Sequence, residues 1–149
     1  MDEYDYKILY ILITLALTIF FIDIHTKHTY ECIKKSSKKN TIIIVLLIHH
    51  ILQIFSTCGW LFNNKIILII YLFAPLFALI HWLTNDNKCY LTQKINKICN
   101  LNDNVLFNDI FLIIGLKKYS IWNNFLYYVY LVITLCIAFY KLLILYKVI

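Results

Sequence analysis

The sequence predicts an all-α integral membrane protein: a four-helix bundle with a short interfacial helix. Of its 149 residues 62% are hydrophobic and only 15% charged, which leaves too little polar surface for a soluble domain of this length. Four apolar runs are each long enough to cross a bilayer as a helix. The fourteen basic residues are all lysine and lie mainly between these runs. The net charge of +6 therefore indicates orientation in a membrane, and no nucleic-acid partner is expected.

The predicted spans are residues 8–24, 41–62, 66–84 and about 125–146. The first span holds Asp23 near its end and has no small-residue cleavage site, so it is expected to be a retained helix and not a signal peptide. Only three residues, 63–65, separate the second and third spans. So short a connection predicts an antiparallel helical hairpin.

The lysines predict the orientation of the chain. An even number of spans places both lysine-rich loops on one face, and the positive-inside rule makes that face cytosolic. Both termini are then lumenal or exterior, and both long loops are cytosolic. The lysines of these loops are Lys27, Lys34, Lys35, Lys38 and Lys39 after the first span, and Lys88, Lys94, Lys97, Lys117 and Lys118 after the third.

The loop between the third and fourth spans contains an apolar segment, residues 105–116, that is too short to cross a bilayer. Two lysines follow it directly, which favours a helix lying in the membrane interface. A re-entrant or core-buried segment is the alternative.

Helical spacing groups the polar residues of the spans into stripes that should face other helices. In the second span, His50 lies about a hundred degrees round the helix from His49, nearer Thr57. Small residues four positions apart should let helices approach closely. The stripes are His49, Gln53, Ser56 and Trp60 in the second span, and Tyr127, Tyr130, Thr134, Ala138 and Lys141 in the fourth; the small-residue pairs are Thr14–Thr18 and Ala74–Ala78.

The histidines are the candidate functional residues, because all five fall in the predicted inner half of the membrane or just beneath it. His49 or His50, with His81 and with Asp23 or His25, could form a metal, haem or proton-handling site. The alternative is that neutral histidines hydrogen-bond to neighbouring helices. We favour this alternative and expect no cofactor, because no ligand motif is present and adjacent histidines point apart. A proton or ion channel, with Gln53, Ser56 and Asp23 on its path, has less support, since no selectivity-filter sequence occurs.

The five cysteines make no clear disulfide framework, and a bridge between Cys89 and Cys99 would argue for the opposite orientation. Cys32, Cys89 and Cys99 share the predicted cytosolic side, where disulfides are rare, and Cys58 and Cys136 lie within spans as small apolar residues. No Cys-x-x-Cys pair or nucleophile motif occurs. A non-enzymatic role is therefore favoured over an enzymatic one.

The stretch "IHWLTNDNKCYLTQK", residues 80–94, resembles a junction in small multi-pass membrane proteins of large DNA viruses of protists. It is more distantly similar to bacterial small membrane proteins of unknown function that carry Cys-Pro-Leu-Thr. The matching residues are His81, Trp82, Asn87, Cys89, Leu91 and Thr92, whereas Tyr90 replaces the bacterial proline. The resemblance covers about fifteen residues and implies a viral source, with no activity to transfer. Trp82 suits the interface, and Thr92 could begin a short helix.

These observations predict a structural or accessory membrane component, in a viral internal membrane or a host endomembrane. Its expected partners are the lipid bilayer, anionic headgroups at the lysine-rich loops, and other proteins or further copies of this chain.

Overall fold

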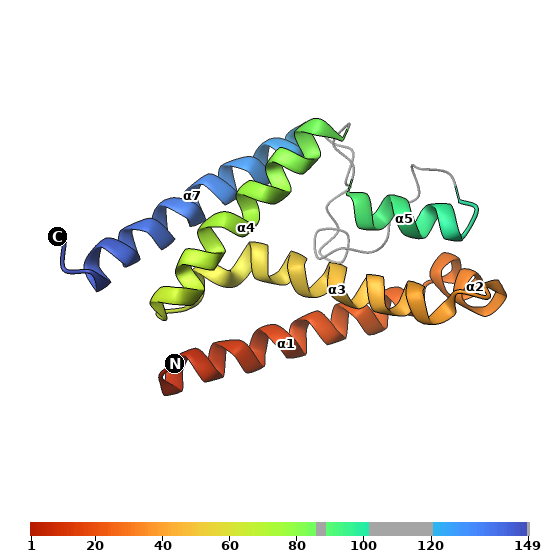
Figure 1. The fold of residues 1–149 in the computed structure, drawn as a ribbon, viewed down its shortest axis with the longest axis horizontal. Coiled ribbons are helices and arrows are strands. Elements are labelled where there is room, and N and C mark those ends of the chain that lie inside the picture. Colours follow the sequence, from red (N-terminus) through yellow and green to blue (C-terminus); the bar gives the residue numbers. More distant parts are fainter. Residues whose placement is uncertain (86–88, 102–120, 149) are drawn as a thin grey trace.

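The structure, a computed structural model, describes residues 1–85, 89–101 and 121–148, with only the backbone of residues 121–127. The described part is helical and contains no strand. The predicted interfacial helix at 105–116 lies outside the described residues. In chain order (Figure 1) the elements are α1 (Glu3–Ile24), α2 (Lys27–Lys35), α3 (Lys39–Cys58), the 3₁₀ turn η1 (Gly59–Leu61), α4 (Lys65–Thr84), α5 (Tyr90–Ile98) and α7 (Ile121–Leu145).

Four of these elements are long and apolar, as the hydropathy of the sequence predicted. Residues 3–24, 39–61, 65–84 and 128–145 contain windows with mean hydropathy of 2.0 to 2.4. The prediction of an all-helical fold with four long apolar helices is confirmed for residues 1–85, 89–101 and 121–148. α1 begins five residues earlier than expected because Asp2 caps it, with its Oδ1 accepting from the Asp5 amide at 2.8 Å. An exposed Glu3–Lys7 ion pair spans the first turn.

The long helices pack as two antiparallel pairs (Figure 1), α1 with α3 and α4 with α7. The pairs meet near the α3–α4 turn and diverge away from it. α3 is the central helix, since it also contacts α2, α4 and α5. Gly59 follows α3 where α4 passes close: a Cβ there would lie 2.5 Å from Cδ2 of the buried Tyr71. Glycine is therefore required for this close approach.

The turn between α3 and α4 is held by a carboxylate from α1 and an ammonium from α7. The Asn63 amide donates to Asp5 Oδ1 at 2.7 Å, and Asp5 is 2% exposed. Lys141 Nζ donates to the carbonyl oxygens of Trp60, Leu61 and Phe62 at 3.2, 3.3 and 3.2 Å and to Asn63 Oδ1 at 3.1 Å. A lysine thus satisfies carbonyl groups that the end of a helix leaves without partners.

The buried face of α1 differs from the predicted one. Thr14 and Thr18 are exposed, and the Thr18 hydroxyl donates to the Thr14 carbonyl of its own helix at 2.8 Å. Ala16 and Ile19, each 2% exposed, instead pack against α3 beside Ile54. The prediction that Thr14 and Thr18 form a small-residue contact between helices is therefore wrong. Ala16, on a different face of α1, is the small residue that lets α3 approach.

The stripe of the fourth span is in place on α7. Thr134 and Ala138 are buried, and the Tyr71 hydroxyl donates to Thr134 Oγ1 at 2.9 Å. Tyr130 donates to the Thr57 carbonyl and accepts from Trp60 Nε1 at 3.2 Å. The Tyr127 side chain lies outside the described residues.

Candidate functional site

A buried carboxylate–imidazole pair joins α1 to α3. His50 Nε2 lies 3.0 Å from Asp23 Oδ2, and both side chains are 0% exposed. Thr29 Oγ1, at the start of α2, donates to Asp23 Oδ1 at 3.3 Å. The pair therefore lies where three helices meet, and the carboxylate orients the imidazole so that Nε2 carries the proton toward it.

The other ring nitrogen of His50, Nδ1, lacks a hydrogen bond to the described residues like the one that Nε2 forms with Asp23. Within the described part of the chain, His50 Nδ1 and Gln53 Oε1 are buried without a hydrogen-bond partner. His50 and Gln53 are three residues apart on α3, so their side chains lie on neighbouring positions of the helix surface. Buried polar atoms without partners are rare because each costs about 1 to 3 kcal/mol.

His49 points to a different neighbour from His50, as their adjacent positions predicted. Its Nδ1 lies 3.6 Å from Cys89 Sγ, at the first turn of α5, while its ring stands edge-on to that of His50 with centroids 5.4 Å apart. His49, Gln53, Ser56 and Trp60 form a half-buried stripe. The fully buried face of α3 carries His50, Ile54 and Thr57 instead, because α1 covers that face.

His81 connects the end of α4 to the start of α5. Its Nε2 accepts the Tyr90 amide at 3.1 Å, and Asn85 Nδ2 donates to Gln93 Oε1 at 2.9 Å nearby. The expected helix in this loop begins at Tyr90 and not at Thr92, which is buried in the first turn of α5. The junction that carried the family resemblance thus fixes one helix against another, with Trp82 half-buried beside it.

Of the predicted ligands, His50 and Asp23 are brought together, whereas His49 and His81 contact other partners. His50 meets Asp23, His49 meets Cys89 and His81 meets a backbone amide. Among the described residues, no three His, Cys, Asp or Glu side chains are placed to hold one metal ion. His25, the other predicted neighbour, forms a hydrogen bond within its own helix end, where its Nδ1 lies 2.7 Å from the Phe21 carbonyl oxygen.

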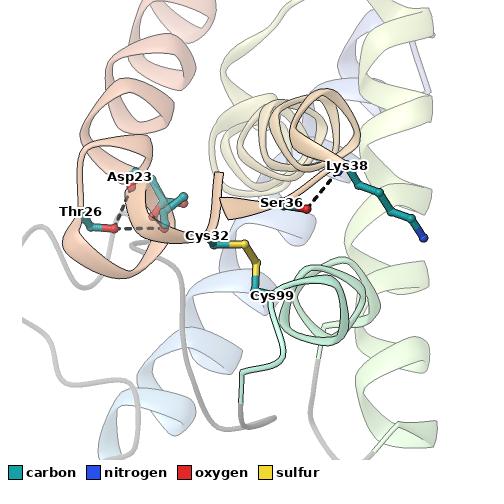
Figure 2. The surroundings of a disulfide bond; sticks show 7 residues. Asp23, Thr26, Cys32, Ser36, Lys38 and Cys99 are labelled. Atoms are coloured by element: carbon teal, nitrogen blue, oxygen red, sulfur yellow. Dashed lines mark hydrogen bonds between the residues drawn. A yellow bond between two sulfur atoms is a disulfide. The ribbon is translucent and has the colours of Figure 1, made fainter. Parts of the chain in front are cut away.

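A disulfide between Cys32 and Cys99 joins α2 to the end of α5 (Figure 2), with the two Cα atoms 5.4 Å apart. The expectation that the predicted cytosolic side opposes disulfides is wrong for these two cysteines in this structure. The two short helices pack against the first turns of α3 around Ile42, Leu46 and Ile95, which brings the cysteines together. Cys58, Cys89 and Cys136 are free.

We define the cap as α2, α5 and the first turns of α3. The buried residues of its two short helices are spaced as on a helix: Thr29 and Cys32 on α2, and Thr92, Ile95 and Asn96 on α5, with the half-buried Cys99 directly after this helix. This spacing is the signal that could have revealed the cap from the sequence. The exposed lysines of the cap are Lys27, Lys34, Lys35, Lys38, Lys39, Lys94 and Lys97.

Comparison with protein-family models, curated proteins and solved structures finds no match to this chain.

Proposed function

We propose that the four long helices cross a lipid bilayer and form a helical bundle there. The observation that supports this is the apolar surface left outside the helix pairs. In the four apolar windows, at most 39% of residues are buried, and large apolar side chains such as Phe77 and Ile66 are 71% and 69% exposed. Helices of 20 to 25 residues are about 30 Å or more long, which matches a bilayer core. Water is a poor solvent for such a surface, and lipid is a good one.

The proposed orientation places the cap in the cytosol and both termini on the opposite side. Seven exposed lysines of the cap support this through the positive-inside rule. The Cys32–Cys99 disulfide favours an oxidising compartment instead. Lysines influence the orientation while the helices insert into the membrane, whereas a disulfide forms later, between segments that have already reached their side of the membrane. The lysines are therefore the stronger determinant of the proposed orientation.

The proposed role is that of a non-enzymatic structural or accessory membrane component whose cap contacts anionic headgroups and other proteins or copies of this chain. The polar side chains of the candidate site support it, because they chiefly bond to one another and link helices. The family resemblance of residues 80–94 extends the proposal to a viral internal membrane or an infected host's endomembrane. In that setting, a basic cap would attract anionic lipids at about 1 kcal/mol per lysine near the surface.

Insertion and orientation are tested together in sealed vesicles. The chain should resist extraction by alkaline carbonate, dissolve in detergent, and lose the segment around Lys38 to protease added on the cytosolic side. Recovery of a well-behaved soluble monomer without detergent would end the membrane proposal. Protection of the Lys38 segment would end the orientation alone.

The Asp23–His50 pair favours one second candidate, a proton-handling role. It is a buried ionisable pair in a chain with apolar helices, and such groups are functional candidates by default. Reconstituted protein would then carry protons across liposomes, and His50→Gln would abolish the flux while leaving the fold intact. If the proton flux of liposomes with the protein equals that of empty liposomes, this candidate function is ruled out. A metal or haem site has no such geometric support and is tested by metal analysis and an absorption spectrum of the purified protein.

A further inference from the structure

A cavity of about 370 Å³ lies beside the disulfide, between α2 and the end of α5. One wall is the outer side of α2, with Lys27, His28, Glu31 and Lys35; the other includes Ile98 and Leu101. The Cys32–Cys99 disulfide lies between the walls and holds them together (Figure 2). The cavity is distinct from the Asp23–His50 pair, whose residues do not line it.

The charges around the cavity favour an anion. The lining residues described include two lysines, Lys27 and Lys35, and one carboxylate. That carboxylate, Glu31, is 3.0 Å from Lys35 Nζ, and the hydrogen bond and charge of Lys35 lower the pKa of Glu31. Glu31 is thus ionised at neutral pH and partly offsets Lys35, while Lys27 adds a further positive charge.

The start of α2 reinforces this preference. Thr26 occupies the N-cap position but makes no side-chain cap bond; its hydroxyl lies 2.8 Å from the Asp23 carbonyl oxygen and 3.0 Å from Thr29 Oγ1. The amide groups of the first turn of α2 therefore receive no hydrogen bond from the Thr26 side chain. Such groups, with the positive end of the helix dipole, favour a negatively charged ligand beside Lys27 and His28.

The opposite wall favours an amphiphile over a simple ion. Ile98 and Leu101 are half-buried apolar side chains at the cavity. α2 begins three residues after the apolar helix α1 ends at Ile24, so the cavity lies near the end of a proposed span. A ligand with an anionic head and an apolar body matches both walls and this position.

We propose that this cavity binds the phosphate-bearing headgroup of an anionic phospholipid, with Lys27 and Lys35 as the cationic contacts and the Cys32–Cys99 disulfide holding the two walls in place. The inference rests on the proposed function, because it requires the cap to lie at a membrane surface. It deepens that function by assigning one site and one lipid class.

The test uses the full chain in nanodiscs and measures its preference for spin-labelled phosphatidylglycerol over phosphatidylcholine. Lys27→Gln/Lys35→Gln removes two charges from the cavity. Lys94→Gln/Lys97→Gln is the matched control, since it removes two exposed charges from the same cap that do not line the cavity. We expect the first variant to lose about fivefold in preference for each lysine, and the control, which removes only the general attraction of the basic cap, to lose several-fold less.

The failures are distinguishable. Equal losses in the two variants would overturn the cavity and leave the basic cap intact. No preference in the unaltered chain would overturn both the cavity and the headgroup part of the proposed function. Abolition of the preference by excess inorganic phosphate would show a free-phosphate site and overturn the lipid assignment.

The role of the disulfide is tested with Cys32→Ser/Cys99→Ser. We expect this variant to lose the preference to the same extent as Lys27→Gln/Lys35→Gln, while its far-UV circular dichroism stays that of the unaltered chain. An unchanged preference would overturn the proposed role of the disulfide. Treating the unaltered chain with a reductant provides the same comparison without a substitution that could impair folding.

Discussion

Removing one partner of the Asp23–His50 pair should destabilise the protein strongly. Both side chains are fully buried, and their only short contact with each other is the 3.0 Å hydrogen bond. Breaking a buried pair by deleting one member typically costs about 3 to 5 kcal/mol, because the other stays buried without its main polar partner. We therefore expect His50→Ala to reduce the free energy of unfolding by about 3 kcal/mol or more. His25→Ala, at an exposed histidine near the same end of α1, should change it by about 0.5 kcal/mol or less.

A double-mutant cycle separates the pair from the loss of packing. Asp23→Ala, His50→Ala and the double variant are unfolded reversibly in mixed micelles, and the coupling energy is calculated from the three changes. Close charge pairs give coupling energies of about 1.5 kcal/mol or more, whereas neutral hydrogen bonds between membrane helices average about 0.6 kcal/mol. Asp23→Asn keeps an acceptor for His50 and for Thr29, so it should retain roughly half of the coupling.

The outcome decides between two interpretations of the pair. A coupling energy at or below about 0.6 kcal/mol would refute the charged pair and leave an ordinary neutral contact. Full retention of coupling in Asp23→Asn would refute it as well, because the asparagine carries no charge.

Three further predictions concern the turn and the disulfide. Gly59→Ala should cost about 1 to 3 kcal/mol in thermal unfolding, since its Cβ would meet Tyr71 at 2.5 Å; an unchanged midpoint would contradict the close approach. Lys141→Met should cost about 1 to 3 kcal/mol in the same assay by leaving the turn carbonyl oxygens without a donor, and equal stability would show that these contacts contribute nothing. Under denaturing, non-reducing conditions maleimide should label three of the five cysteines. Labelling of all five would contradict the Cys32–Cys99 disulfide, whose loss is expected to cost about 4 kcal/mol for a separation of 67 residues.

The four long helices could be predicted from the sequence because hydropathy and helical period are local properties. The divergence of His49 and His50 followed from the same geometry, since adjacent residues on a helix point about a hundred degrees apart. Which of the two would meet Asp23 did not follow. That choice depends on the face that α1 covers, and Ala16, not the Thr14–Thr18 pair, determines the approach of α1.

The disulfide and the turn contacts could not be predicted from local patterns. Cys32 and Cys99 meet because α2 and α5 dock on α3, and 67 residues separate them. Their predicted cytosolic location argued against a disulfide, but a location does not determine whether two cysteines lie close together. Asp5 lies among the acidic residues at the start of the sequence, yet a turn 58 residues away buries it. Lys141 was correctly assigned to the polar stripe of the fourth span. Its partners lie in the turn between α3 and α4, whose conformation the sequence did not predict.

The positions of the polar contacts explain which helices pair. Lipid tails give little hydrophobic drive between helices, so hydrogen bonds and close packing must select partners. α1 is fixed to α3 by Asp23 and His50 at one end, and Asp5 fixes it to the α3–α4 turn at the other. Lys141 brings α7 to that same turn. One turn therefore holds both pairs together, and this accounts for their close approach there. The opposite ends diverge, and there α2 and α5 pack against α3 while the Cys32–Cys99 disulfide joins these two short helices to each other.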